Sequence, residues 1–164
     1  MRTRLPGDHV RTRGDRGGRT ESVRNLSYGG LMTTKPVLDL VVLDCPDPLA
    51  LARFYGEVLG WEVAEGEDPG WVDLVPPGGG VSPENRDGRV SLSFQRIEDW
   101  VAPTWPGGEH PQQFHLDLSV PSIEDAEPAV LAAGASVHNH QPSESGSFRV
   151  YLDPAGHPFC LVRG

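Results

Sequence analysis

Two side chains with chemical capacity lie close together in an alternating segment, Phe114–Val120 (FHLDLSV). Side chains alternate between the two faces of a strand, so His115 and Asp117 share one face and Leu116 and Leu118 share the other. Imidazole and carboxylate groups bind divalent metals and transfer protons. We expect the apolar residues to face a helix and the polar pair to face a cavity, which makes His115 a candidate catalytic residue and Asp117 a candidate substrate-binding residue.

A cysteine and an arginine near the C-terminus form a second group of candidates. Asp153–Gly156 (DPAG) is a turn signal, and a four-residue loop there would pair Arg149 with Cys160. Arg149 would then anchor a carboxylate or phosphate in the cavity, with Tyr151 beside it, unless the guanidinium reaches solvent at the rim. Cys160 could form a catalytic nucleophile pair with His115, or it could be a small buried apolar residue.

Aromatic and amide side chains supply candidates for ligand contact. Phe94 and Gln95 are adjacent in the predicted strand Val90–Arg96, so one of the two must face the cavity. Gln95 could hydrogen-bond a ligand or donate an oxygen to a metal. Trp105 lies in a proline-rich stretch and could close over an apolar ligand, or it could pin its loop against the body of the protein.

Strands and helices in a regular order must position these residues. One helix is predicted from Asp47, a favoured N-cap residue, to Gly60, a favoured C-cap residue. A second helix is predicted from Ser122 to Gly134, and Pro128 inside it should kink the helix or delay its start. Strands are predicted at Val37–Leu43, Trp61–Val63, Gly70–Leu74, Val90–Arg96, Phe114–Val120, Ser136–Asn139, Ser147–Leu152 and Phe159–Val162.

The order of elements occurs twice. Aligning Pro46 with Pro121 matches VVLDCP to LDLSVP, and LGWEV then matches AGASV after a slip of one residue. Two β-α-β-β-β modules follow, over residues 36–97 and 114–163, joined by a linker over 98–113. The predicted fold class is therefore α+β.

Composition narrows the classes of function. The 164 residues carry a formal net charge of −9, so nucleic acid and anionic lipid are not expected partners. No apolar run approaches the roughly 20 residues that a membrane-spanning helix needs. The two cysteines, Cys45 and Cys160, are expected on opposite faces of the sheet without a disulfide, which agrees with a cytoplasmic location.

Residues 1–31 differ from the rest of the chain. They contain seven arginines and three acidic residues, a net charge of +4, whereas residues 32–164 carry −13. Without apolar periodicity this segment cannot bury enough surface to offset its ordering entropy, so we predict a disordered extension before a domain over 32–164. The extension could bind an acidic partner, or it could be a dispensable tail or the product of a wrongly assigned start.

The quoted segments resemble the vicinal oxygen chelate superfamily of glyoxalases, bleomycin-resistance proteins and extradiol dioxygenases, and most of all its glyoxalase-like subgroup. LDCPDPLALARFYGEVLGWEV resembles the first strand, helix and second strand of that fold, and YLDPAGHPFCLV resembles its closing hairpin. The resemblance covers about residues 36–163. It implies two modules whose curled mixed sheet surrounds a small-molecule cavity, a homodimer, and in many members a metal held by two ligands from each module.

The ligand set that the resemblance implies is incomplete. His115 occupies a ligand position, but Leu40 stands at the matching place in the first module. The third position falls on about Leu92, or on Ser93 after a slip of one residue, and Cys160 replaces the usual glutamate. A divalent metal is therefore not favoured as a cofactor, and standard glyoxalase I activity, which needs a metal and a carboxylate base, is not supported.

Two functions remain open. One is a glyoxalase-like enzyme, of lyase or isomerase type, acting on a small oxygenated metabolite; if a metal does bind, Asp117 would be an unorthodox third ligand beside His115 and Cys160. The other is a metal-free protein that binds or sequesters a small molecule, as bleomycin-resistance proteins do. An enzyme requires His115, whereas a binding protein tolerates its loss and loses affinity when Trp105 or Trp71 is replaced by alanine.

Overall fold

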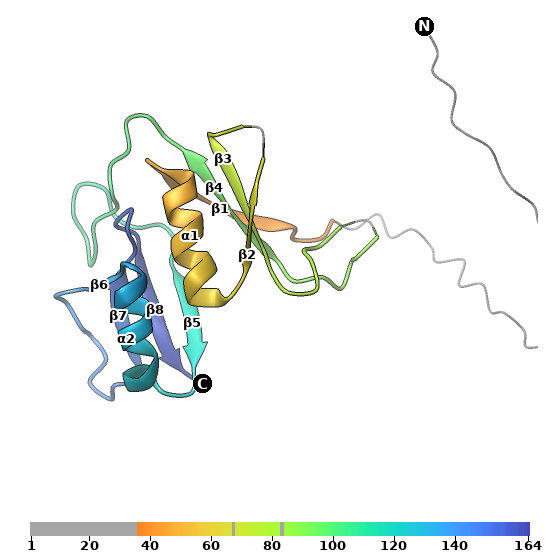
Figure 1. Ribbon diagram of the computed structural model, residues 1–164. Helices are drawn as coiled ribbons and strands as arrows, with labels where there is room; N and C mark the ends of the chain where they lie inside the picture. Colours follow the sequence, from red (N-terminus) through yellow and green to blue (C-terminus); the bar gives the residue numbers. More distant parts are fainter. Residues whose placement is uncertain (1–35, 67, 83) are drawn as a thin grey trace, which may run out of the picture. The chain divides into compact units, whose positions relative to one another are not determined.

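The computed structural model describes residues 36–66, 68–82 and 84–164 (Figure 1). The predicted extension over residues 1–31 lies outside the described residues. No helix in the described part of the chain is long and apolar enough to span a membrane. The elements are β1 (Leu40–Cys45), α1 (Pro48–Leu59), β2 (Glu62–Glu65), β3 (Trp71–Val75), β4 (Ser91–Arg96), β5 (Leu116–Val120), α2 (Ile123–Ala133), β6 (Ser136–Val137), β7 (Phe148–Leu152) and β8 (Pro158–Arg163).

The strands form two four-stranded sheets of the same topology, ordered β1-β4-β3-β2 in module one and β5-β8-β7-β6 in module two. In each module the first strand runs parallel to the last, and the other neighbours are antiparallel. The predicted α+β class and the doubled β-α-β-β-β order are confirmed. We expected one curled sheet, whereas the described strands form two separate sheets that do not close on one another.

The helix of module one begins and ends where the sequence predicts. The Asp47 carboxylate accepts a hydrogen bond from the backbone N–H of Ala50 at 3.1 Å and so satisfies one of the free donors of the first turn. Gly60 ends the helix in the left-handed conformation, at a φ of 66°. The buried face of α1 includes Phe54 and Tyr55, which join it to both sheets.

The helix of module two tolerates the proline that it contains. The Ser122 hydroxyl accepts a hydrogen bond from the N–H of Asp125 at 3.2 Å, and α2 begins at Ile123, so the start that we expected to be delayed is not. Pro128 cannot donate to the carbonyl of Glu124, but it lies on the exposed side of the helix. Water can therefore satisfy that carbonyl.

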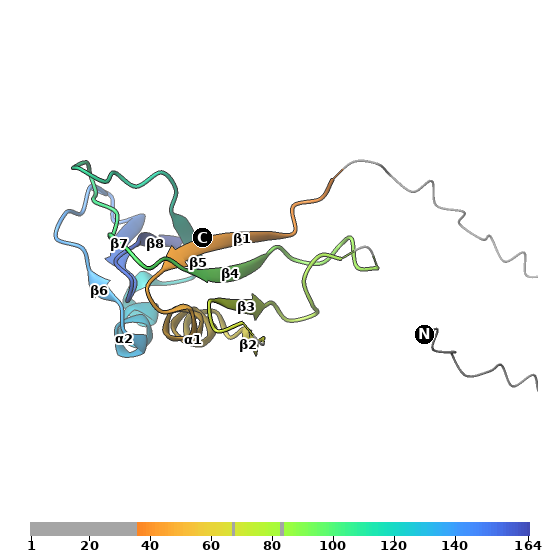
Figure 2. The same ribbon diagram turned by 90° about the horizontal axis from the view of Figure 1, so that it is seen from above.

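An aromatic core joins the two modules. The Tyr55 ring of α1 stacks on Phe94 of β4 with centroids 5.7 Å apart, and Phe54 meets Phe159 of β8 edge to face at 5.9 Å. Tyr151 of β7 stacks on Phe159 at 5.5 Å. Figure 2 shows α1 and α2 on the same side of β1, β4, β5 and β8. We call the other side of each sheet, turned away from these helices, the distal face.

Candidate functional site

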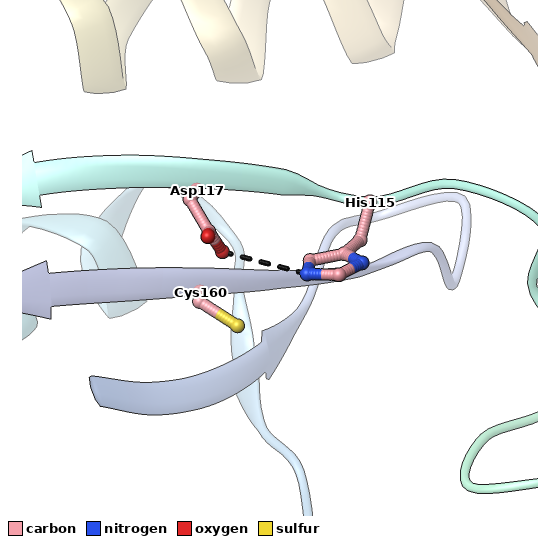
Figure 3. A group of neighbouring side chains, drawn as sticks. All are labelled: His115, Asp117 and Cys160. Atoms are coloured by element: carbon pink, nitrogen blue, oxygen red, sulfur yellow. Dashed lines mark ion pairs between the residues drawn. The ribbon is translucent and has the colours of Figure 1, made fainter. Parts of the chain in front are cut away.

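His115, Asp117 and Cys160 meet on the distal face of module two (Figure 3). Cys160 of β8 is the ladder partner of Asp117 of β5, and His115 lies just before β5. One ligand atom of each residue lies within 4.8 Å of the other two, and Nε2 of His115 is 3.5 Å from Oδ1 of Asp117. Alternation along the strand predicted the shared face of His115 and Asp117. The approach of Cys160 depends on the pairing of two strands far apart in the chain.

The three side chains differ in exposure. Cys160 is 7% exposed, whereas the side chains of His115 and Asp117 are 45% and 60% exposed. Burial, followed by the hydrogen bond and the charge of Asp117, raises the pKa of the Cys160 thiol to about 12. The thiol therefore stays protonated at neutral pH and is not an activated nucleophile. A cation beside the sulfur would be needed to displace the proton.

Arg149 does not pair with Cys160, and this prediction was wrong. Val150 is the ladder partner of Cys160, because the loop between β7 and β8 contains five residues, 153–157, and not four. The N–H of the first loop residue donates to the carbonyl of the last at 3.0 Å and closes the longer loop. Arg149 consequently faces α2, where its guanidinium donates to the carboxylate of Glu127 at 2.8 Å.

Two of the candidates for ligand contact lie in the aromatic core. Phe94 and Tyr151 are fully buried and stack on Tyr55 and Phe159, so both turn away from the distal face. Of the adjacent pair, Gln95 is the residue on the distal face of module one, where it is exposed. The structure therefore brings neither Phe94 nor Tyr151 together with the cluster.

A small cavity of about 210 Å³ borders Cys160 and His115. Trp105 of the linker forms part of its wall. The indole also packs against His138 and His140, with ring centroids 5.3 and 5.2 Å apart. This position suits closure over a ligand and pinning of the linker equally, so both interpretations of Trp105 stay open.

A larger cavity of about 610 Å³ is lined by β1, by the linker and by the residues just before β5. His115 borders this cavity as well as the small one. Asp44 and Glu109 place two carboxylates along the wall, and Val101 and Phe114 add exposed apolar surface. Among the described residues that line it, there is no lysine or arginine.

A buried polar cluster that the sequence did not predict borders the larger cavity through Tyr55 and His157. Asp153 is 4% exposed, and its carboxylate accepts hydrogen bonds from the N–H groups of Ala155 and His157 at 2.9 and 3.0 Å. The Tyr55 hydroxyl donates to it at 3.0 Å, and Nδ1 of His157 lies 2.8 Å away. The turn signal at Asp153 could have indicated the backbone contacts. No signal links it to Tyr55, which lies 98 residues earlier in the chain.

Module one places different residues at the positions of His115, Asp117 and Cys160. Val42 pairs with Ser93 as Asp117 pairs with Cys160, so the counterpart of Cys160 is Ser93. The first assignment, to Leu92, was wrong, and the assignment after a slip of one residue holds. The Ser93 hydroxyl is fully buried and donates to a carboxylate at 2.6 Å. Neither Val42 nor Ser93 is a usual metal ligand. Within the described residues, the group of three possible ligands therefore belongs to module two.

Comparison with known proteins supports the fold. A family described as glyoxalase-like domain matches residues 40–162. A glyoxalase/bleomycin resistance protein/dioxygenase family enzyme from Burkholderia phytofirmans PsJN is similar in structure, with 20% identity, a TM-score of 0.55, and coverage of 77% of this chain and 97% of that chain. At these identities a structural likeness shows the fold alone.

Two further solved structures are similar to this chain. The glyoxalase family protein from Enterococcus faecalis has 23% identity and a TM-score of 0.53, covering 79% of this chain and 98% of that chain. The fosfomycin resistance protein FosX from Mesorhizobium loti has 12% identity and a TM-score of 0.53, covering 77% of this chain and 90% of that chain. A comparison with curated proteins finds no match.

Proposed function

This chain belongs to the glyoxalase-like domain family, and on that premise we propose that it is an enzyme of lyase or isomerase type acting on a small oxygenated metabolite. Its reactive centre is the cluster of His115, Asp117 and Cys160, which holds a divalent metal ion. The observation that carries this proposal is the approach of an imidazole, a carboxylate and a thiol to within 4.8 Å of one another.

The types of ligand suit zinc. Catalytic zinc commonly takes three protein ligands from among histidine, cysteine and acidic residues and leaves a fourth position for water or substrate. The sequence did not favour a metal, because Leu40 and Leu92 or Ser93 stand at ligand positions that the resemblance implies and Cys160 replaces the usual glutamate. The ladder pairing of Asp117 with Cys160, which brings a third possible ligand beside His115, is what supports a metal here. All three ligands come from module two, unlike the two from each module that the resemblance implies. When bound, such an ion polarises a substrate oxygen or lowers the pKa of a bound water.

The side chains of the cluster and of the cavity walls around it account for proton release, exclusion of water and access of the substrate. Cys160 must release its proton to solvent before its sulfur can bind a cation, and a cation held by His115 and Asp117 would favour that release. Trp105 and Val150 wall the small cavity beside Cys160 and limit the access of water. His115 borders both cavities, so a substrate in the larger one can reach the cluster.

Elemental analysis of untagged protein, purified without chelators, tests the proposal. We expect about one equivalent of zinc or another divalent transition metal per chain, lost in His115→Ala and in Cys160→Ser. Cys45→Ala is the matched control, because Cys45 is the other free cysteine and is buried in the core of module one. Protein that stays metal-free after soaking with zinc, iron, nickel and manganese contradicts the metal site.

A second candidate is a metal-free protein that binds a small molecule. The position of Trp105 on the wall of the small cavity favours it. Quenching of tryptophan fluorescence by a panel of aromatic and oxygenated metabolites separates the two functions. A binding protein loses the quenching in Trp105→Ala and keeps it in His115→Ala, whereas an enzyme loses turnover in His115→Ala.

A further inference from the structure

The larger cavity is bordered by an acid–base pair, His157 and Asp153, that is not part of the cluster of His115, Asp117 and Cys160. His157 lines the cavity with its side chain 18% exposed, whereas the side chain of its partner Asp153 is fully buried. A carboxylate removed from water is costly unless polar groups surround it. Here two backbone N–H groups, the Tyr55 hydroxyl and the imidazole surround it.

The contact with Asp153 selects the tautomer of His157. An ionised carboxylate only accepts hydrogen bonds, so Nδ1 of His157, 2.8 Å away, carries a proton and donates it. The ring nitrogen left for a ligand is Nε2, which has no hydrogen-bond partner within the described ranges. The Trp100 ring lies 4.9 Å from the imidazole, and its Nε1 donates to the carbonyl of Ala155 at 3.0 Å, which supports the ring from the linker side.

Both modules contribute to holding this pair. Tyr55 belongs to α1 of module one, and Asp153 follows β7 of module two. Burial and the charge of Asp153 raise the pKa of Tyr55 well above its usual value, so the phenol stays protonated and keeps donating across the neutral range. The imidazole is therefore fixed by packing between modules and not by its turn alone.

The wall of the larger cavity does not suit an anionic ligand. Asp44 and Glu109 contribute negative charge, and no lysine or arginine stands among the described lining residues to balance it. Val42, Val101 and Phe114 present apolar surface. A neutral or cationic organic molecule with an apolar body fits this wall, whereas a phosphate or a dicarboxylate does not.

We propose that His157 is a catalytic general base in the larger cavity, with Asp153 as its positioning residue, and that it removes a proton from a C–H group of a neutral or cationic organic substrate. The C–H bond breaks, an N–H bond forms at Nε2, and the electron pair stays on the substrate as an enolate or expels a leaving group. The imidazolium, stabilised by Asp153, then returns the proton to the substrate or to the leaving group. This inference rests on the proposed function in assigning isomerase or lyase chemistry to the cavity.

A neutral carbon acid, 5-nitrobenzisoxazole, is the probe for this base. Removal of its C–H proton breaks the ring N–O bond and releases a coloured cyanonitrophenolate, with no other reactant needed. In the full chain with EDTA present, we expect a saturable rate above that of buffer and a loss of at least about tenfold in His157→Gln. His140→Gln is the matched control, because His140 is an exposed histidine outside the lining of this cavity, and it should keep the full rate.

Two further measurements separate catalysis from a structural role. Asp153→Asn removes the carboxylate that orients the imidazole, so kcat for the probe should fall while KM stays close to that of the unmodified chain. If His157→Gln does not fold, ¹⁵N NMR of the unmodified protein decides, because the base requires a proton on Nδ1 and none on Nε2.

The absence of any rate above buffer, equal rates in the unmodified chain and His157→Gln, or a proton on Nε2 would each overturn the proposal. Because the probe is used with EDTA, these outcomes do not depend on the metal site. The elemental analysis likewise does not depend on His157, so the two proposals can fail separately.

Discussion

The two modules share a topology but differ in the chemistry of their distal faces. In each, the first strand pairs in parallel with the last, and three positions on this pair are equivalent. These positions hold Leu40, Val42 and Ser93 in module one, and His115, Asp117 and Cys160 in module two. Module one presents two aliphatic groups and a hydroxyl, whereas module two presents an imidazole, a carboxylate and a thiol, which are possible metal ligands.

The helix-facing positions do not differ in this way. Leu43 and Cys45 of β1, like Leu116 and Leu118 of β5, all pack in the hydrophobic core. Close packing constrains each residue on that face, because a change in volume costs stability. On the distal face Val42, His115 and Asp117 are exposed and carry less of this constraint, so the two modules can differ in chemistry at these positions.

The largest expected effect is on the free energy of unfolding. It tests whether stability depends more on the buried Asp153 carboxylate of module two than on the Asp73 carboxylate of module one. Asp153→Ala removes the acceptor of Tyr55 and of two backbone N–H groups, and should lower the free energy of unfolding by about 3–5 kcal/mol. In module one, Asp73 accepts from Trp71 and Ser93 but is only partly buried, so Asp73→Ala should cost about 1–2 kcal/mol. Urea denaturation measures both losses; similar values would contradict the difference.

The next prediction concerns double substitutions that exchange distal-face residues between the two modules. His115→Leu combined with Asp117→Val gives module two the residues that module one has at Leu40 and Val42. Both changed side chains are exposed, so stability should change by less than about 1 kcal/mol, while metal affinity should fall about 100-fold or more. The reciprocal variant, Leu40→His with Val42→Asp, should bind no metal, because Ser93 is not a ligand. Metal titration and thermal melts check both, and a double variant that retains its metal would place the ligands elsewhere.

A smaller effect concerns the Cys160 thiol of module two, which lies beside the Asp117 carboxylate. Asp117→Asn, in a Cys45→Ala background, removes a charge that raises the pKa of Cys160 and leaves an amide oxygen as a hydrogen-bond acceptor. That pKa should fall below about 12 yet stay above 9.0, because burial, the largest cause, remains. Thiolate absorbance against pH measures it, and an unchanged value would mean that the carboxylate does not act on the thiol.

The same change alters stability at alkaline pH. The Cys160 thiol ionises in the unfolded chain near 9.0 and in the folded chain at about 12, so its contribution to stability is lost as pH rises through that window. The asparagine variant should lose this contribution over a narrower range of pH. Unfolding free energies measured across the window provide the check.

The smallest expected effect is that of Arg149→Ala. Its ion pair with Glu127 is partly exposed and should contribute less than about 1 kcal/mol. Because Arg149 lies on the helix-facing side of β7, metal content and the rate with the benzisoxazole probe should not change. A marked loss of either would restore Arg149 as an anchor for a ligand.

Local patterns account for what could be predicted. Asp47 and Gly60 bound α1 because caps act within one turn of the helix, and alternation placed His115 and Asp117 on one face because side chains alternate along any strand. The prediction that Arg149 pairs with Cys160 was wrong for an equally local reason. A loop longer by one residue turns each side chain of β7 to the other face of the sheet.

The helix limits, the doubled order of elements and the candidate side chains could be predicted from local patterns, since each depends on neighbours a few residues away. Long-range pairing in the folded chain is what brings Cys160 to Asp117, turns Arg149 to α2 and lets Tyr55 donate to Asp153 across 98 residues. These contacts arise from strand register and from packing between modules. Both depend on pairings between distant segments, which no local pattern encodes.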